Sequence, residues 1–214
     1  DVTTDLPTRI ARDGGFVLRR TWGGSVDTML RRGAKTGFGS DLPISLDGLS
    51  YNLPIAGRAI SYKDTRLLPI AAIGAYTIDT VSGAHAGRVV LKTRTLDGVE
   101  GGLVFAERSA RRLSLAGGTT FEHGHALVAV ESRMQRGLKA HTADDRLSMI
   151  AAVSKELAPN LTLDGHVRTY REIWDDVGSL PSDELASDDF SAAAQHPRRF
   201  RFARVVLAAA AYRC

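Results

Sequence analysis

The chain has 214 residues, a formal net charge of +4, 43% hydrophobic residues and 24% charged residues. This composition excludes wholesale disorder, and no run of about 18 apolar residues is present, which excludes a membrane protein built from spanning helices. The single cysteine, Cys214, excludes an internal disulfide, so packing and hydrogen bonds must hold the fold.

The first 42 residues read as an irregular segment, because glycines divide them into short pieces. Two local elements are possible within it. Residues 25–32, "SVDTMLRR", could form a short helix capped by Ser25, and residues 15–22, "GFVLRRTW", could form a strand. We expect 1–42 to act as a plug, a linker or a first strand, and 43–214 to form an antiparallel β domain.

Strand signals dominate from residue 43 onward. β-Branched and aromatic residues, separated by turn residues, recur over 43–80. The next stretch, 87–134, predicts a meander built from "GRVVLKTRT" (87–95), "LVFAER" (103–108), "RLSLAGGTTF" (112–121) and "ALVAVESRM" (126–134). The turn signals between these strands are "LDGVEGG" (96–102) and "EHGH" (122–125).

Residues 143–158, "ADDRLSMIAAVSKELA", fit two structures. As a helix they would begin after Thr142 and end before Pro159, and the intrinsic propensity of their residues favours this choice. As a strand they would alternate, with Met149 and Ala151 on an apolar face opposite serine and glutamate. The choice matters, because a helix here would interrupt the run of strands.

The segment that begins at residue 161 alternates strictly between apolar and polar side chains. The apolar set is Leu161, Leu163 and Val167. The polar set is Asp164, His166 and Arg168. Successive side chains of a strand point to opposite faces, so one face of this sheet is apolar and the other is charged. The apolar face either packs on a protein core or faces lipid.

The chain closes with a polar loop and a strand. Residues 175–197 are rich in serine and aspartate, with a helical turn or two expected near 183–194, and residues 198–214 read as the final strand. We therefore predict an all-β fold, an antiparallel meander of about ten to twelve strands with one or two short helices. Closure of that meander into a barrel is one option.

The last hairpins resemble those of bacterial outer-membrane β-barrels. The shared features are the short turn "APN" (158–160) between two amphipathic strands, the long polar loop 175–197, and a final strand that ends near Tyr212. Autotransporter translocator domains and porin-like proteins share this ending. In such barrels short turns face the periplasm and long loops lie outside. The connections here alternate in the same way if 143–158 is a strand.

The resemblance implies an outer-membrane pore, or the translocator part of an exported protein, with the lipid bilayer as its partner. The alternative is a soluble antiparallel sheet with one face packed and the other solvated. Such a protein would be a β-rich structural or assembly component, for example of a virion or tail, that associates with copies of itself.

The polar faces supply the candidate functional residues. They are Arg112, Glu131, Arg133, Asp164, His166 and Arg168. In a barrel, charged side chains on the inner wall would line the lumen, where they set pore selectivity or brace a plug. On a soluble sheet the same residues would be ordinary solvated positions.

Other chemistry has weak support in the sequence. His123 and His125, with Glu122 beside them, are the metal candidates, because imidazoles two residues apart on a strand project to the same side. No further cluster of ligands stands nearby in the sequence, and no cofactor is expected. There is no nucleophile elbow, P-loop or paired-cysteine motif, so we expect no catalytic role. Arginines are spread along the chain with few aromatics beside them, which argues against nucleic acid as a partner.

Overall fold

The computed structural model describes residues 5–21, 26–31, 44–50, 68–79, 88–106, 110–135, 143–176 and 198–213. Within these ranges the chain forms twelve strands, one α-helix and one short 3-10 helix, so the predicted β-dominated fold is confirmed. The strands belong to three sheets, of two, four and six strands.

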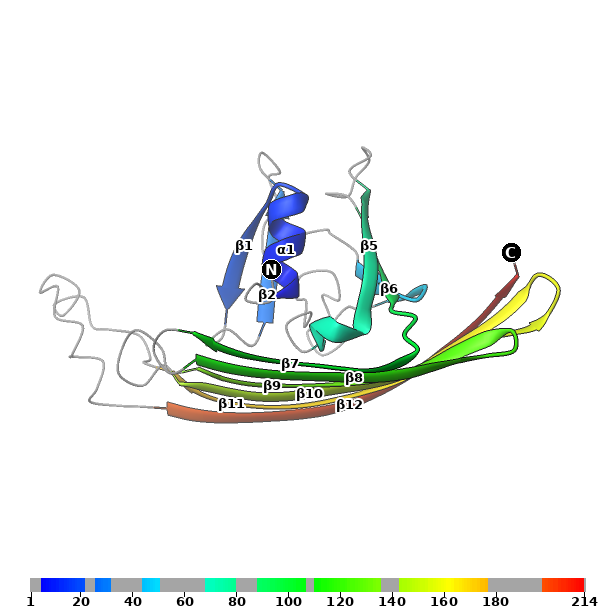
Figure 1. Ribbon diagram of the computed structural model, residues 1–214. Coiled ribbons are helices and arrows are strands. Elements are labelled where there is room, and N and C mark those ends of the chain that lie inside the picture. The colour runs from blue at the N-terminus through cyan, green and yellow to red at the C-terminus, as the bar shows by residue number, and fades with distance from the viewer. Residues whose placement is uncertain are drawn as a thin grey trace, which may run out of the picture.

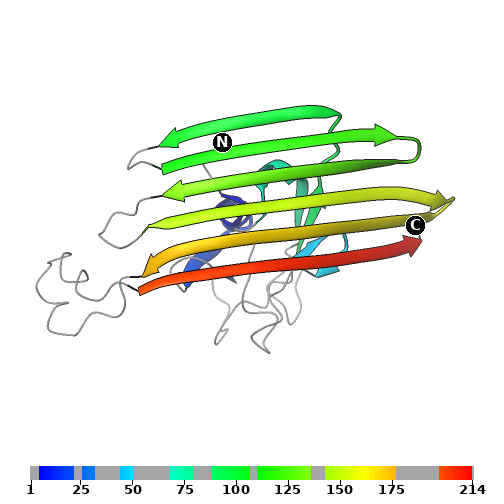
Figure 2. The same ribbon diagram turned by 90° about the horizontal axis from the view of Figure 1, so that it is seen from below.

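The six-stranded sheet is an antiparallel meander. Its strands are β7 (Gly98–Ala106), β8 (Ala110–Phe121), β9 (Gly124–Gln135), β10 (Asp144–Ala158), β11 (Leu161–Asp176) and β12 (Arg198–Arg213). Each strand pairs with the next one along the chain, and Figure 2 shows them side by side in that order. Among the described strands, β7 and β12 are the two edges of this sheet.

The elements that precede the meander form what we call the N-terminal unit, the described residues between Asp5 and Thr93. It contains α1 (Leu6–Asp13), β1 (Phe16–Thr21), β2 (Val26–Arg31), β3 (Ile44–Leu46), β4 (Leu49–Ser50), the 3-10 helix η4 (Ile70–Ala72), β5 (Ile73–Asp79) and β6 (Arg88–Thr93). The pairs β1–β2, β3–β4 and β5–β6 are antiparallel, whereas β3 and β6 run parallel. The predicted division of the chain at residue 42 stays a prediction.

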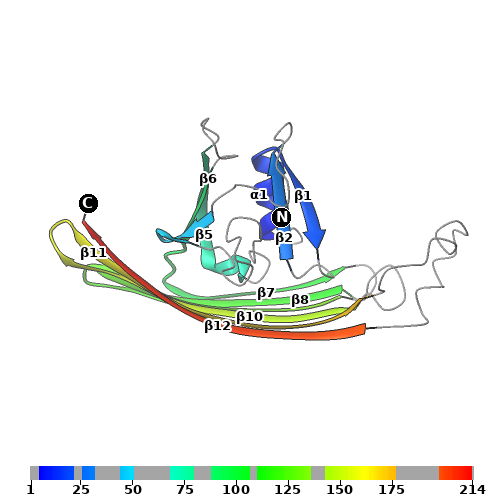
Figure 3. The same ribbon diagram turned by 180° about the vertical axis from the view of Figure 1, so that it is seen from behind.

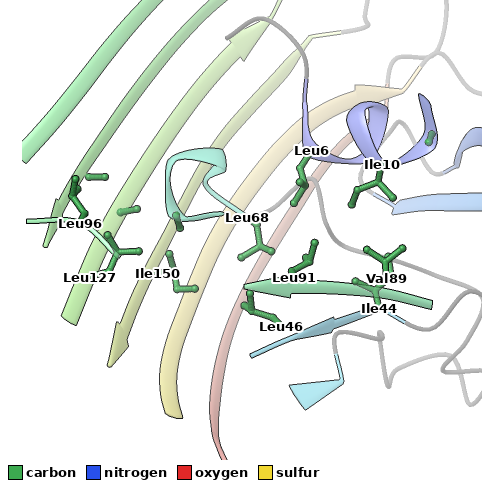
Figure 4. Packing of buried hydrophobic residues seen from close by; sticks show 14 of the residues in the cluster. Leu6, Ile10, Ile44, Leu46, Leu68, Val89, Leu91, Leu96, Leu127 and Ile150 are labelled. Carbon is green, nitrogen blue, oxygen red and sulfur yellow. The ribbon is translucent and has the colours of Figure 1, made fainter. Parts of the chain in front are cut away.

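The N-terminal unit stands on one side of the six-stranded sheet. The sheet is bowed, and α1 and strands β1, β2, β5 and β6 lie over its concave face, as two opposite views show (Figures 1 and 3). The apolar cluster joins the two parts. It includes Leu6, Ile10, Leu46, Leu68 and Leu91 of the N-terminal unit, and Ala116, Leu127, Ala129 and Ile150 of the sheet (Figure 4). The interface between unit and sheet therefore contains part of the hydrophobic core.

Helix α1 is short but well terminated. The Asp5 side chain accepts a hydrogen bond from the Thr8 N–H at 3.1 Å, Pro7 occupies the first turn, and Gly14 follows the last helical residue. At its end, the Tyr76 hydroxyl of β5 donates a hydrogen bond to the Asp13 carboxylate. This bond, with a smaller effect of Arg12, lowers the pKa of Asp13. The contact therefore stabilises the fold above the ordinary aspartate pKa and is lost as the pH falls through the lowered value.

The structure decides two choices that the sequence left open. Residues 144–158 form strand β10 rather than a helix, because β10 pairs with β9 on one edge and β11 on the other along most of its length. Two ladders of hydrogen bonds outweigh a helix propensity of a few tenths of a kcal/mol per residue. Residues 26–31 form β2 rather than a helix, and the competing strand over 15–22 is confirmed by β1. The helical turns expected near 183–194 lie outside the described residues.

One local prediction is wrong, namely the sheet that β6 joins. We expected it to lead the meander, but it pairs with β3 and β5, and the meander begins at β7. The turn predicted over 96–102 is also shorter, since β7 already begins at Gly98. Residues 94–97 are thus the crossing from the N-terminal unit to the sheet. A bidentate ion pair fixes this crossing, with the Arg94 guanidinium 2.6 and 2.7 Å from the carboxylate oxygens of Glu100.

Gly118 of β8 lies where this crossing passes over the sheet. A Cβ atom at Gly118 would come within 2.5 Å of the Leu96 carbonyl oxygen and 2.9 Å of the Ala126 carbonyl oxygen, both of them backbone atoms. We expect Gly118→Ala to lower the free energy of unfolding by about 1–3 kcal/mol, as overpacking does. Denaturant unfolding followed by tryptophan fluorescence measures this.

Gly102 of β7 is the matched control. It is a glycine of the same sheet with no atom within 4 Å of the position that a Cβ atom would occupy, so Gly102→Ala should leave the unfolding midpoint nearly unchanged. Equal effects of the two substitutions would contradict the role we give to the crossing.

Candidate functional site: the two faces of the six-stranded sheet

The register of the strands divides the sheet into two faces. We call the face toward the N-terminal unit the inner face and the opposite one the outer face. Arg112, Arg133, Arg146 and Glu172 stand opposite one another on neighbouring strands, so they share the inner face. Their sequence neighbours occupy the outer face, because side chains alternate along a strand.

The outer face is apolar and exposed. Twelve large apolar side chains of β7 to β11 on this face are each at least 36% exposed: Val99, Leu103, Phe105, Leu113, Leu115, Val128, Met134, Leu147, Met149, Val153, Leu163 and Val167. Phe121 at the end of β8 is exposed to a similar degree. A soluble monomer rarely exposes a contiguous apolar patch of such extent. None of the described elements covers this face in any of the three ribbon views (Figures 1 to 3).

Charged side chains lie at both ends of this apolar band. Arg111, Asp145 and Arg171 are exposed near the end where 136–143 and 177–197 connect the strands, and Lys155 is exposed near the opposite end. Between these margins the outer-face positions of β8 to β11 carry no ionisable residue. The outer face is therefore a band of apolar side chains with a charged margin on each side.

The inner face is polar and buried, the reverse of a soluble sheet. Arg112 is 8% exposed, Glu131 5%, Arg146 2% and Glu172 1%. Ser148 and Tyr170 are buried on the same face. An apolar patch of Ala116, Leu127, Ala129 and Ile150 lies beside these groups and packs on the N-terminal unit. The inner face thus offers the N-terminal unit both an apolar and a charged contact area.

Glu131 is the centre of the charged contact area. Its Oε2 atom lies 2.7 Å from Nη2 of Arg112 on the neighbouring strand. The same oxygen accepts a hydrogen bond from the backbone N–H of Ile70, the first residue of η4, at 3.1 Å. One carboxylate therefore neutralises a buried cation and also holds the N-terminal unit to the sheet.

Asp5 makes a second link of the same kind. Its Oδ1 atom caps α1, and its Oδ2 atom lies 3.6 Å from Nη1 of Arg133. Arg133 also donates to Oε1 of Gln135 at 2.7 Å. Arg146, which stands between Arg133 and Glu172 in the cross-strand row, pairs with Asp144 at 3.8 Å. The row of arginines is thus neutralised by carboxylates from both the sheet and the N-terminal unit.

The structure places all six predicted polar residues on the inner face. Arg112, Glu131, Asp164 and His166 are buried, and Arg133 and Arg168 are half-buried. It brings Arg112 and Glu131 into direct contact, whereas Asp164, His166 and Arg168 lie along β11, farther down the same face. That this face lines a lumen stays a prediction.

The two histidines proposed as metal candidates are separated. His123 sits in the turn after β8, is exposed, and lies 3.5 Å from Glu122, while His125 is half-buried on β9. Within the described part of the chain, no group of three or more potential metal ligands is brought together.

Sequence reasoning missed several residues of the inner face. Arg146 and Ser148 belong to it, and reading 143–158 as a strand would have found them by alternation. Tyr170 and Glu172 extend the pattern of Asp164, His166 and Arg168 by two more positions. Asp5 and the Ile70 N–H carry no sequence signal of their contacts, because these form only when distant segments pack.

Comparisons with known proteins agree at the level of the fold. No protein-family model and no curated protein matches the chain. The FrpB iron transporter from Neisseria meningitidis (F3-3 variant) superposes with a TM-score of 0.64 and 14% identity, over 98% of this chain and 35% of that one. The ferric citrate transporter FecA in its unliganded form gives 0.58 and 16%, over 83% of this chain and 30% of that one.

The chain therefore spans about a third of the length of the solved structures that it matches. Its fold is similar to part of each of these two structures, so the expected bacterial outer-membrane β-barrel-like fold is supported. The narrower expectation, that the chain is an autotransporter translocator or a porin, is not supported by these comparisons. Among the described residues, no helix is long and apolar enough to cross a bilayer.

The Glu131 contact gives a direct test of how the N-terminal unit is held. Glu131→Ala removes the acceptor shared by Arg112 and Ile70, and breaking a buried ion pair from one side costs about 3–5 kcal/mol. Glu100→Ala is the matched control, because its pair with Arg94 is half-exposed and should cost less than about 1 kcal/mol. Equal losses in denaturant unfolding would show that burial does not strengthen the Glu131 contact.

Proposed function

We propose that this chain is the plug-bearing part of an outer-membrane transporter, in which the six-stranded sheet is a piece of the barrel wall and the N-terminal unit fills the lumen. The observation that carries the proposal is the inverted burial of the sheet, with charged residues inside and large apolar residues exposed. Outer-membrane barrels have this arrangement, an apolar outer band around a polar interior.

The energetics favour lipid over water on the outer face. Burying one large apolar side chain completely contributes about 1.5–3 kcal/mol. Leaving twelve of them partly in water forgoes on the order of 10 kcal/mol, which is comparable with the whole stability of a typical domain. Acyl chains against this face remove that cost without a second protein layer.

The height of the apolar band fits a bilayer. On β10, Lys155 follows Asp145 by ten residues, and both are charged and exposed on the outer face. Ten residues of strand span about 33 Å, and at a tilt of about 40° this covers about 25 Å along the membrane normal. An outer-membrane barrel has an apolar band of about 25 Å. The charged margins would then lie at the two membrane surfaces.

The covered inner face favours a plugged transporter over an open pore. Porins leave an aqueous channel, whereas the larger outer-membrane transporters carry a plugged lumen. Here the Glu131 and Asp5 contacts and the shared apolar cluster attach the N-terminal unit to the face that would line the lumen. The two neighbours described above are named as an iron transporter and a ferric citrate transporter, so ferric chelates are the first solutes to test.

The connections give the chain an orientation. Two-residue turns, Glu122–His123 and Pro159–Asn160, join the strands at one end, and 107–109, 136–143 and 177–197 join them at the other. Barrels of this type place short turns in the periplasm and longer loops outside. We therefore assign the end with Glu122 to the periplasm and the end with Asp145 to the cell exterior.

The membrane assignment is tested by two arginine substitutions at different depths of the apolar band, one near its middle and one at its charged margin. Val128 and Met134 lie on the outer face of β9 and are 51% and 50% exposed, but Met134 stands in register with Arg111 and Asp145 at the charged margin. In phospholipid vesicles Val128→Arg should cost about 2–4 kcal/mol and Met134→Arg about 0–1 kcal/mol. Reversible denaturant unfolding in vesicles measures both.

Two outcomes would contradict the membrane assignment. One is an equal cost of both substitutions. The other is a wild-type chain that stays monodisperse in plain buffer without detergent. A soluble oligomer in plain buffer would instead support the self-associating assembly protein, which also covers an apolar face.

Orientation is tested by labelling intact cells. In a Cys214→Ser background, Asp145→Cys should react with a membrane-impermeant maleimide from outside, because Asp145 is exposed at the loop end. Glu122→Cys, exposed in a short turn, should react only after the outer membrane is permeabilised. The reverse pattern would overturn the orientation while leaving the barrel assignment intact.

A further inference from the structure

Three arginines stand side by side across the inner face of the sheet. Arg112 of β8 is opposite Arg133 of β9, and Arg133 is opposite Arg146 of β10. Neighbouring strands lie about 4.8 Å apart, and like charges directly opposite one another destabilise a sheet. This row of arginines therefore needs carboxylates close by, and the origin of each carboxylate decides which guanidinium can exchange its partner.

The carboxylates of the row come from two different parts of the molecule. Arg112 is paired with Glu131 and Arg146 with Asp144, and both acidic residues belong to the sheet itself. Arg133 lies against the carboxylate of Asp5, which precedes α1 and belongs to the N-terminal unit. Arg133 is thus the arginine of the row that the N-terminal unit neutralises.

The contact between Asp5 and Arg133 is loose. Their Oδ2 and Nη1 atoms are 3.6 Å apart, whereas a charge-assisted hydrogen bond between nitrogen and oxygen is about 2.7–2.9 Å long. The pair of Arg112 and Glu131, at 2.7 Å, is of the shorter kind. The side chain of Arg133 is also 19% exposed, against 9% for Arg112 and 2% for Arg146. Arg133 is therefore the guanidinium of this row that a solute reaches most easily.

Asp5 can release Arg133 while α1 stays folded and docked. Its Oδ1 atom caps α1 by accepting a hydrogen bond from the Thr8 N–H, and it is the other carboxylate oxygen that lies nearest Arg133. Loss of the Arg133 contact leaves this cap in place, together with the burial of Leu6 and Ile10 in the apolar cluster. A carboxylate from solution can therefore replace Asp5 on Arg133 without unfolding the N-terminal unit.

Arg133 lies near the end of the sheet at which the longer connections are found. The next residue, Met134, stands in register with Arg111 and Asp145 at the charged margin. In the orientation proposed above, this is the end toward the cell exterior. A solute that enters from outside would then meet Arg133 at the start of the inner face.

We propose that Arg133 is an anion-binding residue that takes a carboxylate-bearing solute in place of Asp5. The group that it replaces is a carboxylate, and a planar guanidinium can donate two parallel hydrogen bonds to a carboxylate. Solute and Asp5 exclude each other, so each weakens the binding of the other. The transport role of this exchange rests on the proposed function, in which it narrows the solutes to chelates with free carboxylates.

The experiment measures citrate binding to the full chain by isothermal titration calorimetry at constant ionic strength. Asp5→Asn keeps a good helix cap but removes the competing charge, so it should tighten citrate binding by about two- to fivefold, the size expected for a partly exposed ion pair. Arg133→Gln removes the guanidinium and should weaken binding by at least about tenfold.

Two matched controls make the same changes in net charge elsewhere. Asp13→Asn removes an exposed carboxylate at the other end of α1, and Arg171→Gln removes an exposed guanidinium on the outer face. Both variants should bind citrate as tightly as the wild type does. The proposal is overturned if Asp5→Asn tightens binding no more than Asp13→Asn, or if Arg133→Gln binds citrate as well as Arg171→Gln.

The two arms of the experiment are independent of folding defects and of the membrane assignment. If Arg133→Gln does not fold, the comparison of Asp5→Asn with Asp13→Asn decides the question. Citrate binding needs no bilayer, and the vesicle experiment with Val128→Arg needs no citrate. Binding without membrane insertion would overturn the transport role alone, whereas insertion without binding would overturn the anion site alone.

Discussion

The alternation of side chains along six strands, with charged residues on the covered face and apolar residues on the uncovered one, is the constraint on which the rest of the structure depends. A face that buries Arg112, Arg146 and Glu172 needs partners for their charges, and a face that exposes Leu103, Val128 and Met149 needs an apolar environment. On the first face, Glu131 and Asp144 of the sheet pair with Arg112 and Arg146, and Asp5 of the N-terminal unit pairs with Arg133. In the function that we propose, a bilayer supplies the apolar environment of the second face.

The way the N-terminal unit is attached follows from that constraint. An entirely apolar N-terminal unit would leave Arg133 without the carboxylate of Asp5, so the interface combines an apolar patch with specific polar contacts. Glu131 and Asp5 each use two interactions, one within their own element or sheet and one across the interface. Ion pairs of this kind contribute little net stability over apolar packing, but they fix position, because a misplaced partner leaves a buried charge.

Much of the fold could be predicted from the sequence, and the failures have physical causes. The strands β8, β9 and β11 were readable because their alternation is strict and their turns are short. β10 was not, because alanine, leucine and lysine favour a helix locally and only pairing on both edges makes the strand the better choice. That β6 pairs with β3 and β5 instead of joining the meander could not be predicted, because the sequence of a strand does not show which sheet it joins.

The candidate site divides in the same way. Alternation alone located the six predicted inner-face residues, and it would have added Arg146 had β10 been read as a strand. The partners across the interface could not be predicted, because Asp5 and Ile70 are 128 and 61 residues from their contacts and nothing local marks either one. Which face would be buried was also undecided, since alternation shows that two faces differ and says nothing about the solvent of each.

Among the described strands, β7 and β12 each have one edge without a partner, which bears on how the proposed barrel wall would enter a bilayer. Each edge presents a row of peptide groups that water can solvate but hydrocarbon cannot, and each unsatisfied group costs several kcal/mol there. Insertion therefore has to coincide with the pairing of the β7 and β12 edges with further strands. Assembly and membrane entry would then be one cooperative event.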